Sequence, residues 1–240
     1  MDEFRLDARH PGSALFTTRK SGYSRAPYDQ LNLATHVGDE PGAVAANRRV
    51  VEERIGAPIS WMEQVHGNNV AVLAAAPAEP VAGTDALVTA TPGVALGVLV
   101  ADCVPVVITA ASVIAVAHAG RRGLVNGIAR RTVETMTDMG TTPTELHVWM
   151  GPAICGGCYE VPVDMQHEAE LAAPGCAVST TKGTAGIDIR AGLLSQLLEL
   201  GISEQLIHVS PACTAETAEL YSHRRDGVTG RFAGIVTMPI

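Results

Sequence analysis

The sequence predicts a mixed α/β fold, a single domain over residues 1–240 in which a buried mixed sheet is flanked by helices. Two observations predict it. Short runs rich in valine, isoleucine and threonine follow one another in the middle of the chain, and they are apolar throughout rather than alternating, which is typical of strands buried on both faces. Segments with helical spacing of apolar residues lie before and after these runs. Strands buried on both faces require helices packed around the sheet.

The first predicted element is a helix over residues 39–56, which Pro41 begins and Gly56 ends. Its inward stripe consists of Val44, Arg48, Val51 and Ile55. An unpaired charge that faces a core is expensive to bury, so Arg48 has two interpretations. Either a carboxylate or snorkelling satisfies it, or it faces an anion.

Six strands are predicted from apolar runs bounded by turn residues. They span residues 85–89, 94–100, 104–109, 113–117, 146–150 and 206–209. Two further helices are predicted over residues 124–139 and 190–200, each followed by a glycine. An Asp226-Gly227 turn predicts a closing hairpin that leads into a strand over residues 232–237.

Composition excludes several classes of protein. Hydrophobic residues make up 47% of the chain and charged residues 18%, which is typical of a folded globular protein. A net charge of -8 argues against a nucleic-acid partner. The apolar stretch over residues 94–111 is interrupted by Gly97, Asp102 and Pro105, so it does not predict a membrane span. Residues 1–5 lack a basic region followed by an apolar segment, which predicts a cytoplasmic protein, and composition leaves the oligomeric state open.

Three chemically versatile residues lie where apolar runs end. His66 precedes Gly67, Cys103 separates two predicted strands, and His118 follows the run over residues 113–117. Imidazole nitrogen and thiolate sulfur are ligands that zinc favours, and three protein ligands leave a fourth position open, as in catalytic sites. The spacing matches no short zinc motif, and a buried cysteine is often only a small apolar residue.

The same residues permit a second chemistry. Cys103 would be a nucleophile and His118 its general base, with Asp102 or Gln64 orienting the imidazole. The sequence does not separate a thiolate bound to zinc from one activated by histidine.

Arginines mark candidate anion sites. Arg121 and Arg122 lie between Gly120 and Gly123, in a turn that joins a predicted strand to a predicted helix. Backbone N–H groups at the start of a helix and guanidinium groups can together bind phosphate or carboxylate. The alternative is an exposed basic turn. Three arginines surround the turn at residues 226–227, as surface charge or as anion donors: Arg224, Arg225 and Arg231. His36 is a further candidate to line a site.

Five cysteines, an odd number, indicate reduced thiols or metal ligands rather than a disulfide framework. Cys155 and Cys158 form a C-x-x-C pair with no second pair nearby, which we interpret as a glycine-rich loop in a pocket wall rather than a redox or zinc motif. Cys176 and Cys213 carry no functional signal.

Several ordered motifs resemble the YfiH-type laccase-domain family, nearly from end to end of the chain. They are Phe16-Thr17-Thr18-Arg19, Leu31-Asn32-Leu33, His36-Val37-Gly38-Asp39, Asn47-Arg48, Gln64-Val65-His66-Gly67, Asp85-Ala86-Leu87-Val88-Thr89, Ala101-Asp102-Cys103-Val104-Pro105, Ala117-His118-Ala119-Gly120, and Arg224-Arg225-Asp226 to Gly230-Arg231. The resemblance implies one α/β domain and a zinc site built from His66, Cys103 and His118. Copper is the alternative metal.

The resemblance also implies an activity. Members are described as purine nucleoside phosphorylases that cleave methylthioadenosine and deaminate adenosine, and earlier as copper-dependent polyphenol oxidases; some bacterial relatives are described as peptidoglycan editing factors. We therefore expect purine nucleosides and phosphate as substrates, with neither nucleic acid nor membrane as partner. Cys103, His118 and Arg48 are the expected catalytic residues. The residues expected to bind substrate or phosphate are Arg48, Gln64, Arg122 and His36.

Two departures from the family pattern and three rival functions remain. The family usually has tryptophan where this chain has Arg121, which removes a surface for stacking a purine ring, and Cys155 to Cys158 stand where it usually has Gly-Pro-Cys-Cys. The fold resembles that of cysteine–histidine deamidase toxins, so an amide hydrolase that edits peptidoglycan precursors is the first rival. Copper-dependent polyphenol oxidation and a zinc-stabilised scaffold without enzymatic activity are the others.

Overall fold

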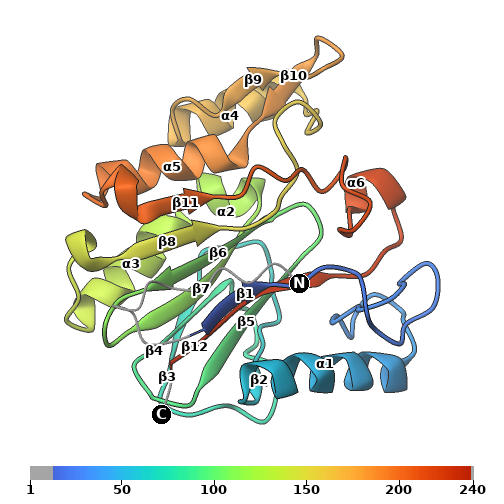
Figure 1. Cartoon of the computed structure of the whole chain (residues 1–240). Helices are drawn as coiled ribbons and strands as arrows, with labels where there is room; N and C mark the ends of the chain where they lie inside the picture. The colour runs from blue at the N-terminus through green and yellow to red at the C-terminus, as the bar shows by residue number, and fades with distance from the viewer. Residues whose placement is uncertain (1–12, 239–240) are drawn as a thin grey trace.

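The computed structural model describes residues 13–238, so the prediction made on residues 1–5 lies outside the described part. The chain forms four layers, namely a helical layer, a six-stranded sheet, a four-stranded sheet and a single helix (Figure 1). Three apolar clusters fill the spaces between successive layers. The mixed sheets with helices packed on their outer faces confirm the predicted mixed α/β class.

The six-stranded sheet is mixed and has the order β11-β8-β6-β7-β4-β3. Its strands are β3 (Val70–Leu73), β4 (Ala86–Thr89), β6 (Val104–Thr109), β7 (Ile114–Ala119), β8 (His147–Met150) and β11 (Ile207–Val209). β6 is antiparallel to both β7 and β8, whereas β8 and β11 are parallel. The carboxyl ends of β7, β8 and β11 therefore meet at one edge of the sheet.

The four-stranded sheet packs face to face against the first and has the order β1-β12-β5-β2. Its strands are β1 (Ser13–Phe16), β2 (Ile59–Ser60), β5 (Ala95–Val100) and β12 (Phe232–Thr237). Along β5, Leu96 and Val98 point into the cluster between the sheets, while Ala95 and Leu99 point to the opposite side. The continuous apolar runs are thus explained differently from the prediction, because a second sheet covers one face where helices were expected.

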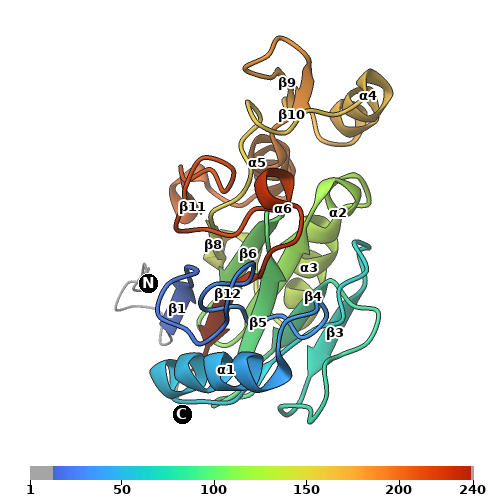
Figure 2. The ribbon, with the colours of Figure 1, turned by 90° about the vertical axis from the view of Figure 1, so that its right-hand side faces the viewer.

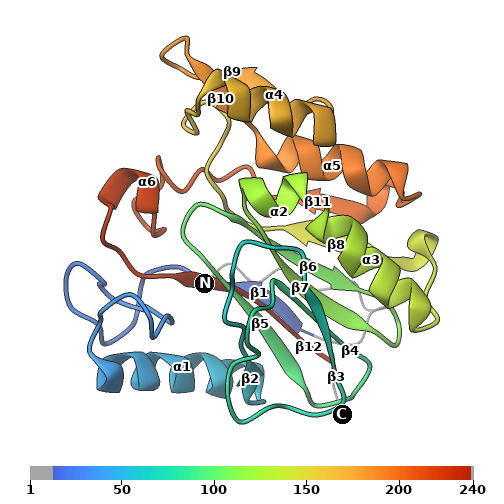
Figure 3. The ribbon, with the colours of Figure 1, turned by 180° about the vertical axis from the view of Figure 1, so that it is seen from behind.

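Two predicted helices are confirmed. α1 (Pro41–Ile55) has Glu40 as its N-cap and Gly56, at φ 79°, as its C-cap. It covers the outer face of the four-stranded sheet, and Figure 2 shows it on the side opposite α5 (Ile189–Glu199). The helical layer on the six-stranded sheet contains α3 (Ile128–Asp138) and α5, which are seen from behind in Figure 3.

One predicted helix is wrong in its extent. The segment expected as residues 124–139 contains two helices, α2 (Arg121–Val125) and α3 (Ile128–Asp138). Gly127 separates them in the left-handed conformation at φ 74°, which favours glycine.

The predicted closing hairpin is also wrong. Residues at the Asp-Gly turn form a short helix, α6 (His223–Asp226), and β12 pairs with β1 and β5 rather than with the preceding segment. Helix α4 (Val163–Ala172) and the hairpin of β9 (Ala177–Ser179) and β10 (Ala185–Ile187) were not predicted. Two short 3₁₀ helices, at Pro143–Glu145 and Glu204–Leu206, precede β8 and β11.

No helix within residues 13–238 combines the length and apolar character that crossing a bilayer requires.

Candidate functional site

A cavity of about 570 Å³ lies where the loops after β2, β5, β7, β8 and β11 converge. Its size fits a small-molecule ligand. The polar and aromatic residues of its lining are Thr35, His36, Arg48, Trp61, Glu63, Gln64, His66, Asp102, Cys103, His118, Tyr159, His223, Arg224 and Arg231.

His66, Cys103 and His118 lie together at this cavity, as the sequence predicts. Their ligand atoms are all within 4.8 Å of one another, and the two imidazole rings meet edge to face with centroids 4.6 Å apart. His118 belongs to β7, Cys103 to the turn between β5 and β6, and His66 to the loop between β2 and β3. The fold therefore joins three segments that are distant in sequence.

A buried carboxylate, Asp85, orients two of the three residues. Asp85 accepts hydrogen bonds from the backbone N–H groups of His66 at 2.9 Å and Gly67 at 2.7 Å, and it lies 2.9 Å from His118 Nδ1. Since an ionised carboxylate only accepts, Nδ1 carries a proton, and Nε2 is the nitrogen that remains to bind a metal or to hold a proton beside Cys103. The expectation that Asp102 or Gln64 orients His118 is wrong. The sequence offered only one weak signal for Asp85, a carboxylate at the start of a buried strand.

The electrostatics favour a charged Cys103–His118 pair. Burial would raise the pKa of the Cys103 thiol, but the charge and hydrogen bonds of His118 and His66 lower that pKa to about 6. Burial would lower the pKa of His118, but Cys103 and Asp85 raise it to about 9. Burial likewise opposes ionisation of Asp85, and its hydrogen bonds from His118 and Gly67 nevertheless lower its pKa. Without a metal, the site holds a thiolate beside an imidazolium.

Space for a metal ion at this site depends on Gly120. A Cβ atom at this position would lie 2.9 Å from Cys103 Sγ and 3.4 Å from His66 Cδ2. Any side chain here would therefore occupy the region on which the thiolate and imidazole converge. Two imidazoles, one thiolate and this clearance fit a zinc ion with one position open to the cavity.

Asp102 holds the turn that carries Cys103. At φ 100° it has an unusual backbone conformation for a residue other than glycine. Its carboxylate accepts hydrogen bonds from Thr214 Oγ1 at 2.6 Å, Ser222 Oγ at 2.7 Å and the backbone N–H of Arg224 at 2.6 Å. These bonds link the Cys103 turn to the loop after β11 and to α6.

Gln64 lines the cavity, and its amide is engaged with the four-stranded sheet. Its Nε2 donates to the carbonyl of Leu99 at 2.8 Å, and its Oε1 accepts from the Leu99 N–H at 3.0 Å. Gln64 therefore fixes the segment that leads to His66 against β5, in addition to facing the cavity.

A cationic wall, formed by Arg48 and Arg231, faces the same cavity, and His36 also lines it. Arg48 Nε donates to the carbonyl of Leu33 at 2.9 Å, and its guanidinium lies 4.8 Å from the centroid of the Trp61 ring. The terminal nitrogens of Arg48 make no hydrogen bond to residues 13–238, so they can bind an anion. Burial, then the charges of Arg231 and Arg48, lowers the pKa of His36.

Three other arginines named from the sequence lie outside the cavity lining or have structural roles. Arg122 is exposed and does not line the cavity, because α2 begins at Arg121 and successive helical residues point in different directions. Arg121 pairs with Glu168 on α4 at 2.7 Å. Arg225 donates to three backbone carbonyls and to Asp226, which is a structural role.

Sequence reasoning missed the cavity residue Tyr159 and did not single out Arg231. Tyr159 lines the cavity next to the C-x-x-C loop, and the Arg224 guanidinium lies 5.0 Å from its ring centroid. The sequence names Arg231 as one of three arginines around the turn at residues 226–227 and gives no reason to prefer it. Tyr159 supplies an aromatic surface in the cavity, whereas Arg121, at the position where the family usually has tryptophan, is outside the lining.

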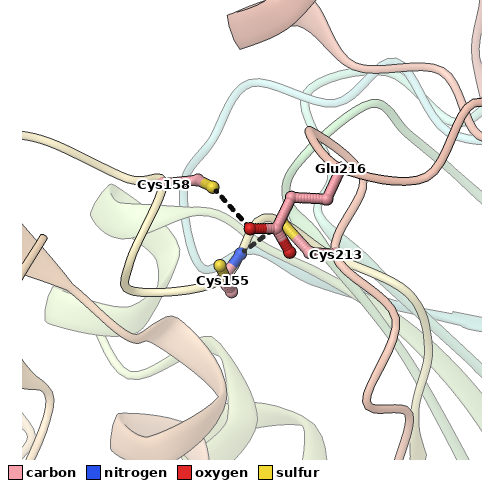
Figure 4. Close-up of side chains that lie close together, drawn as sticks. All are labelled: Cys155, Cys158, Cys213 and Glu216. Atoms are coloured by element: carbon pink, nitrogen blue, oxygen red, sulfur yellow. Dashed lines mark hydrogen bonds between the residues drawn. The ribbon is translucent and has the colours of Figure 1, made fainter. Parts of the chain in front are cut away.

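The C-x-x-C loop and Cys213, which are distant in the sequence, lie next to each other in the structure. Cys155 and Cys158 are joined by Cys213 and Glu216, and the four ligand atoms lie within 4.8 Å of one another (Figure 4). The loop after β11 supplies the partners that were absent from the neighbouring sequence.

Comparison with known proteins gives the family. A family model described as multi-copper polyphenol oxidoreductase laccase matches residues 13–239. The chain belongs to this family. A Corynebacterium glutamicum member, named purine nucleoside phosphorylase, is 50% identical over 98% of each chain. The crystal structure of YlmD from Geobacillus stearothermophilus aligns with a TM-score of 0.90 and 32% identity over 100% of each chain. That of the hypothetical protein YfiH from Bacillus licheniformis aligns with a TM-score of 0.89 and 29% identity over 98% of each chain. The predicted YfiH-type resemblance within this laccase family is confirmed.

Proposed function

We propose that the protein is a zinc-dependent purine nucleoside phosphorylase. The observation that carries the proposal is that one cavity is lined by the His66–Cys103–His118 group and by the cationic wall. The group of three residues can hold a metal ion, and the cationic wall can hold phosphate. The cavity, at about 570 Å³, has room for a nucleoside beside them. The name of the relative that is 50% identical supports the same substrates.

His66, Cys103 and His118 would hold the zinc ion, with His118 binding through Nε2 because Asp85 engages Nδ1. A bound zinc ion supplies Lewis-acid charge that positions and polarises a polar atom of the substrate. Copper is the alternative metal for the same donors, since imidazole and thiolate bind both.

The chain's own groups can perform the phosphorolysis. In this reaction a phosphate oxygen forms a bond to the ribose anomeric carbon while the bond to the purine nitrogen breaks. Arg48 and Arg231 would hold the phosphate and counter its charge, with His36 at the rim of the cavity. The departing purine must take up a proton. Tyr159 lines the cavity and would supply it, as a weak acid because burial raises the pKa of its hydroxyl.

Adenosine deamination is proposed as a second activity of the same cavity. The same donor set suits zinc-assisted hydrolysis of an aromatic amine. Ammonia released from adenosine in the absence of phosphate would separate this activity from phosphorolysis.

The test is a product assay with zinc-loaded protein. Inosine, adenosine and methylthioadenosine are each incubated with and without phosphate, and free base and the sugar phosphate are quantified. We expect base release that depends on phosphate, with equal amounts of ribose-1-phosphate, or its methylthio analogue. If no purine nucleoside releases base, the proposal is wrong.

A second candidate function is a cysteine-dependent amide hydrolase. The observation that favours it is that His118 interacts with Cys103 on one side and with Asp85 on the other. This is the order of a nucleophile, a base and an orienting carboxylate. Chelation discriminates between the two functions. It should abolish a zinc mechanism, and it should leave a thiol mechanism unchanged or improve it.

A further inference from the structure

The chain carries a second group of metal-ligand residues apart from the His66–Cys103–His118 group, which we call the thiol cluster: Cys155, Cys158, Cys213 and Glu216 (Figure 4). Cys155 and Cys158 are on the loop after β8, and Cys213 and Glu216 are on the loop after β11. All four cysteine and carboxylate ligand atoms lie within 4.8 Å of one another. The cluster therefore joins the loops that follow two parallel neighbouring strands.

The two halves of the thiol cluster have the same local backbone. In the first, the N–H groups of Cys158 and Tyr159 both donate to the carbonyl of Cys155, at 3.0 Å each. In the second, the N–H groups of Glu216 and Thr217 both donate to the carbonyl of Cys213, at 3.2 and 2.9 Å. The spacing is thus C-x-x-C in one turn and C-x-x-E in the other, so two matched turns present two ligands each.

Hydrogen bonds already join the members of the cluster. The backbone N–H of Cys155 donates to Cys213 Sγ at 3.3 Å, and Cys158 Sγ donates to Glu216 Oε1 at 3.4 Å. Cys213 Sγ is thus already an acceptor, whereas a bound cation would displace the proton that Cys158 donates to Glu216. Cys213 is 4% exposed and Glu216 is exposed, so the cluster is closed on one side and accessible on the other.

We propose that the thiol cluster is a structural zinc site with three thiolate ligands and one carboxylate ligand. Four protein ligands in a tetrahedral set are typical of structural rather than catalytic zinc. A zinc–sulfur distance of about 2.3 Å places neighbouring ligand atoms about 3.8 Å apart. The 4.8 Å limit already approaches this value, so binding requires only small side-chain movements.

A redox role for the C-x-x-C pair explains less of the geometry. A Cys155–Cys158 disulfide would use two of the four groups and would leave Cys213 and Glu216 beside it without a purpose. A zinc ion uses all four. The cysteines are free thiols in this structure, as the zinc site requires.

The site would stabilise one wall of the cavity. Ile154 and Tyr159, which flank the first turn, both line the cavity. Thr214, which follows Cys213, donates to Asp102 at 2.6 Å, and Asp102 precedes Cys103. A zinc ion at the thiol cluster would therefore hold Tyr159 and the Cys103 turn in place without touching substrate.

The test measures zinc per chain after zinc loading and dialysis, by elemental analysis, in full-length protein. Cys213→Ser and Cys158→Ser should each lose one equivalent, and Glu216→Gln should bind this zinc at least about tenfold more weakly. Cys176→Ser changes a buried cysteine outside both groups and should lose none. His66→Ala should retain the zinc of the thiol cluster, so the result is independent of the proposed function.

Cobalt substitution gives a second measurement, which reports the ligands by absorption rather than by stoichiometry. Co²⁺ in the thiol cluster should show strong sulfur-to-cobalt charge-transfer absorption that Cys158→Ser largely removes and His66→Ala leaves in place. The proposal is overturned if zinc loading leaves the same stoichiometry in wild type and in both cysteine variants. A Cys155–Cys158 disulfide in the zinc-loaded native protein, detected by mass spectrometry, would also overturn it.

Discussion

The His66–Cys103–His118 group and the thiol cluster differ in ligand number, surroundings and position. The first has three ligands, faces the cavity and has its imidazole oriented by a buried carboxylate. The second has four ligands, joins two loops and lies beside the cavity wall. An open ligand position suits chemistry and a closed set suits stability, so we assign turnover to the first group and support of the fold to the second.

The largest expected difference is in activity. Cys103→Ala should lower kcat for phosphorolysis by at least about 10²-fold with a small change in melting temperature, because a metal contributes several kcal/mol to the transition state. Cys213→Ser should lower the melting temperature and retain most of kcat. Steady-state kinetics and thermal unfolding on the same preparations check this. Equal loss of activity in both variants would contradict the assignment of turnover to the His66–Cys103–His118 group alone.

The role of Asp85 gives the next largest effect. Asp85→Asn leaves His118 and the loop at residues 65–67 without their ionised acceptor, so zinc affinity at the open site should fall about 10- to 100-fold. A competition titration with a fluorescent chelator measures this. Asp188→Asn, which changes the N-cap of α5, is the control and should leave zinc affinity unchanged. An unchanged affinity in Asp85→Asn would refute the orienting role.

The thiolate at Cys103 can be titrated in metal-free protein. Since its pKa is lowered to about 6, the rate of alkylation by iodoacetamide should rise with pH through about 6 and level off above about pH 7. In His118→Ala the midpoint should move up toward the ordinary thiol value. Site-resolved mass spectrometry follows Cys103 separately from the thiol cluster. A wild-type midpoint near 9 would contradict the charged pair.

Phosphate binding should depend on the cationic wall. Arg48→Ala should raise the KM for phosphate about tenfold, the equivalent of one charge-assisted hydrogen bond at about 1.4 kcal/mol. Arg49→Ala on the same helix is exposed and serves as the control. A rise in the KM for nucleoside alone would instead place Arg48 at the nucleoside.

The smallest effect concerns two glycines, one beside each group. Gly120→Ala places a methyl group 2.9 Å from Cys103 Sγ and should weaken zinc binding at the open site about fivefold, for roughly 1 kcal/mol of crowding. Gly157→Ala meets Cys155 Sγ at 3.7 Å and a Thr181 methyl at 3.3 Å, so zinc binding at the thiol cluster should change little. If the two variants weaken zinc binding equally, steric clearance does not distinguish the two sites.

The sequence predicts much of the fold, because apolar runs and helix ends carry local signals. α1 and β6 begin and end within two residues of the predicted ranges. The second sheet was not predictable, because burial on both faces of a strand does not say what covers each face. The break at Gly127 was missed, since an isolated glycine in a helical pattern is often tolerated.

The candidate site is likewise predictable only in part from the sequence. His66, Cys103 and His118 were found because each follows an apolar run, and the fold brings strand ends to one edge. Asp85 and Cys213 act through contacts with residues far along the chain, which spacing does not encode. Cys155 and Cys158 were visible as a pair, but their partners became apparent only with the parallel pairing of β8 and β11.

Anomalous diffraction at the zinc edge, on crystals of zinc-loaded protein soaked with phosphate, tests the difference between the two groups most directly. We predict two peaks. One should have His66, Cys103 and His118 as its only protein ligands and an open side toward the cavity, with phosphate on the cationic wall. The other should have the four ligands of the thiol cluster. A single peak, or a fourth protein ligand that closes the first site, would contradict the account.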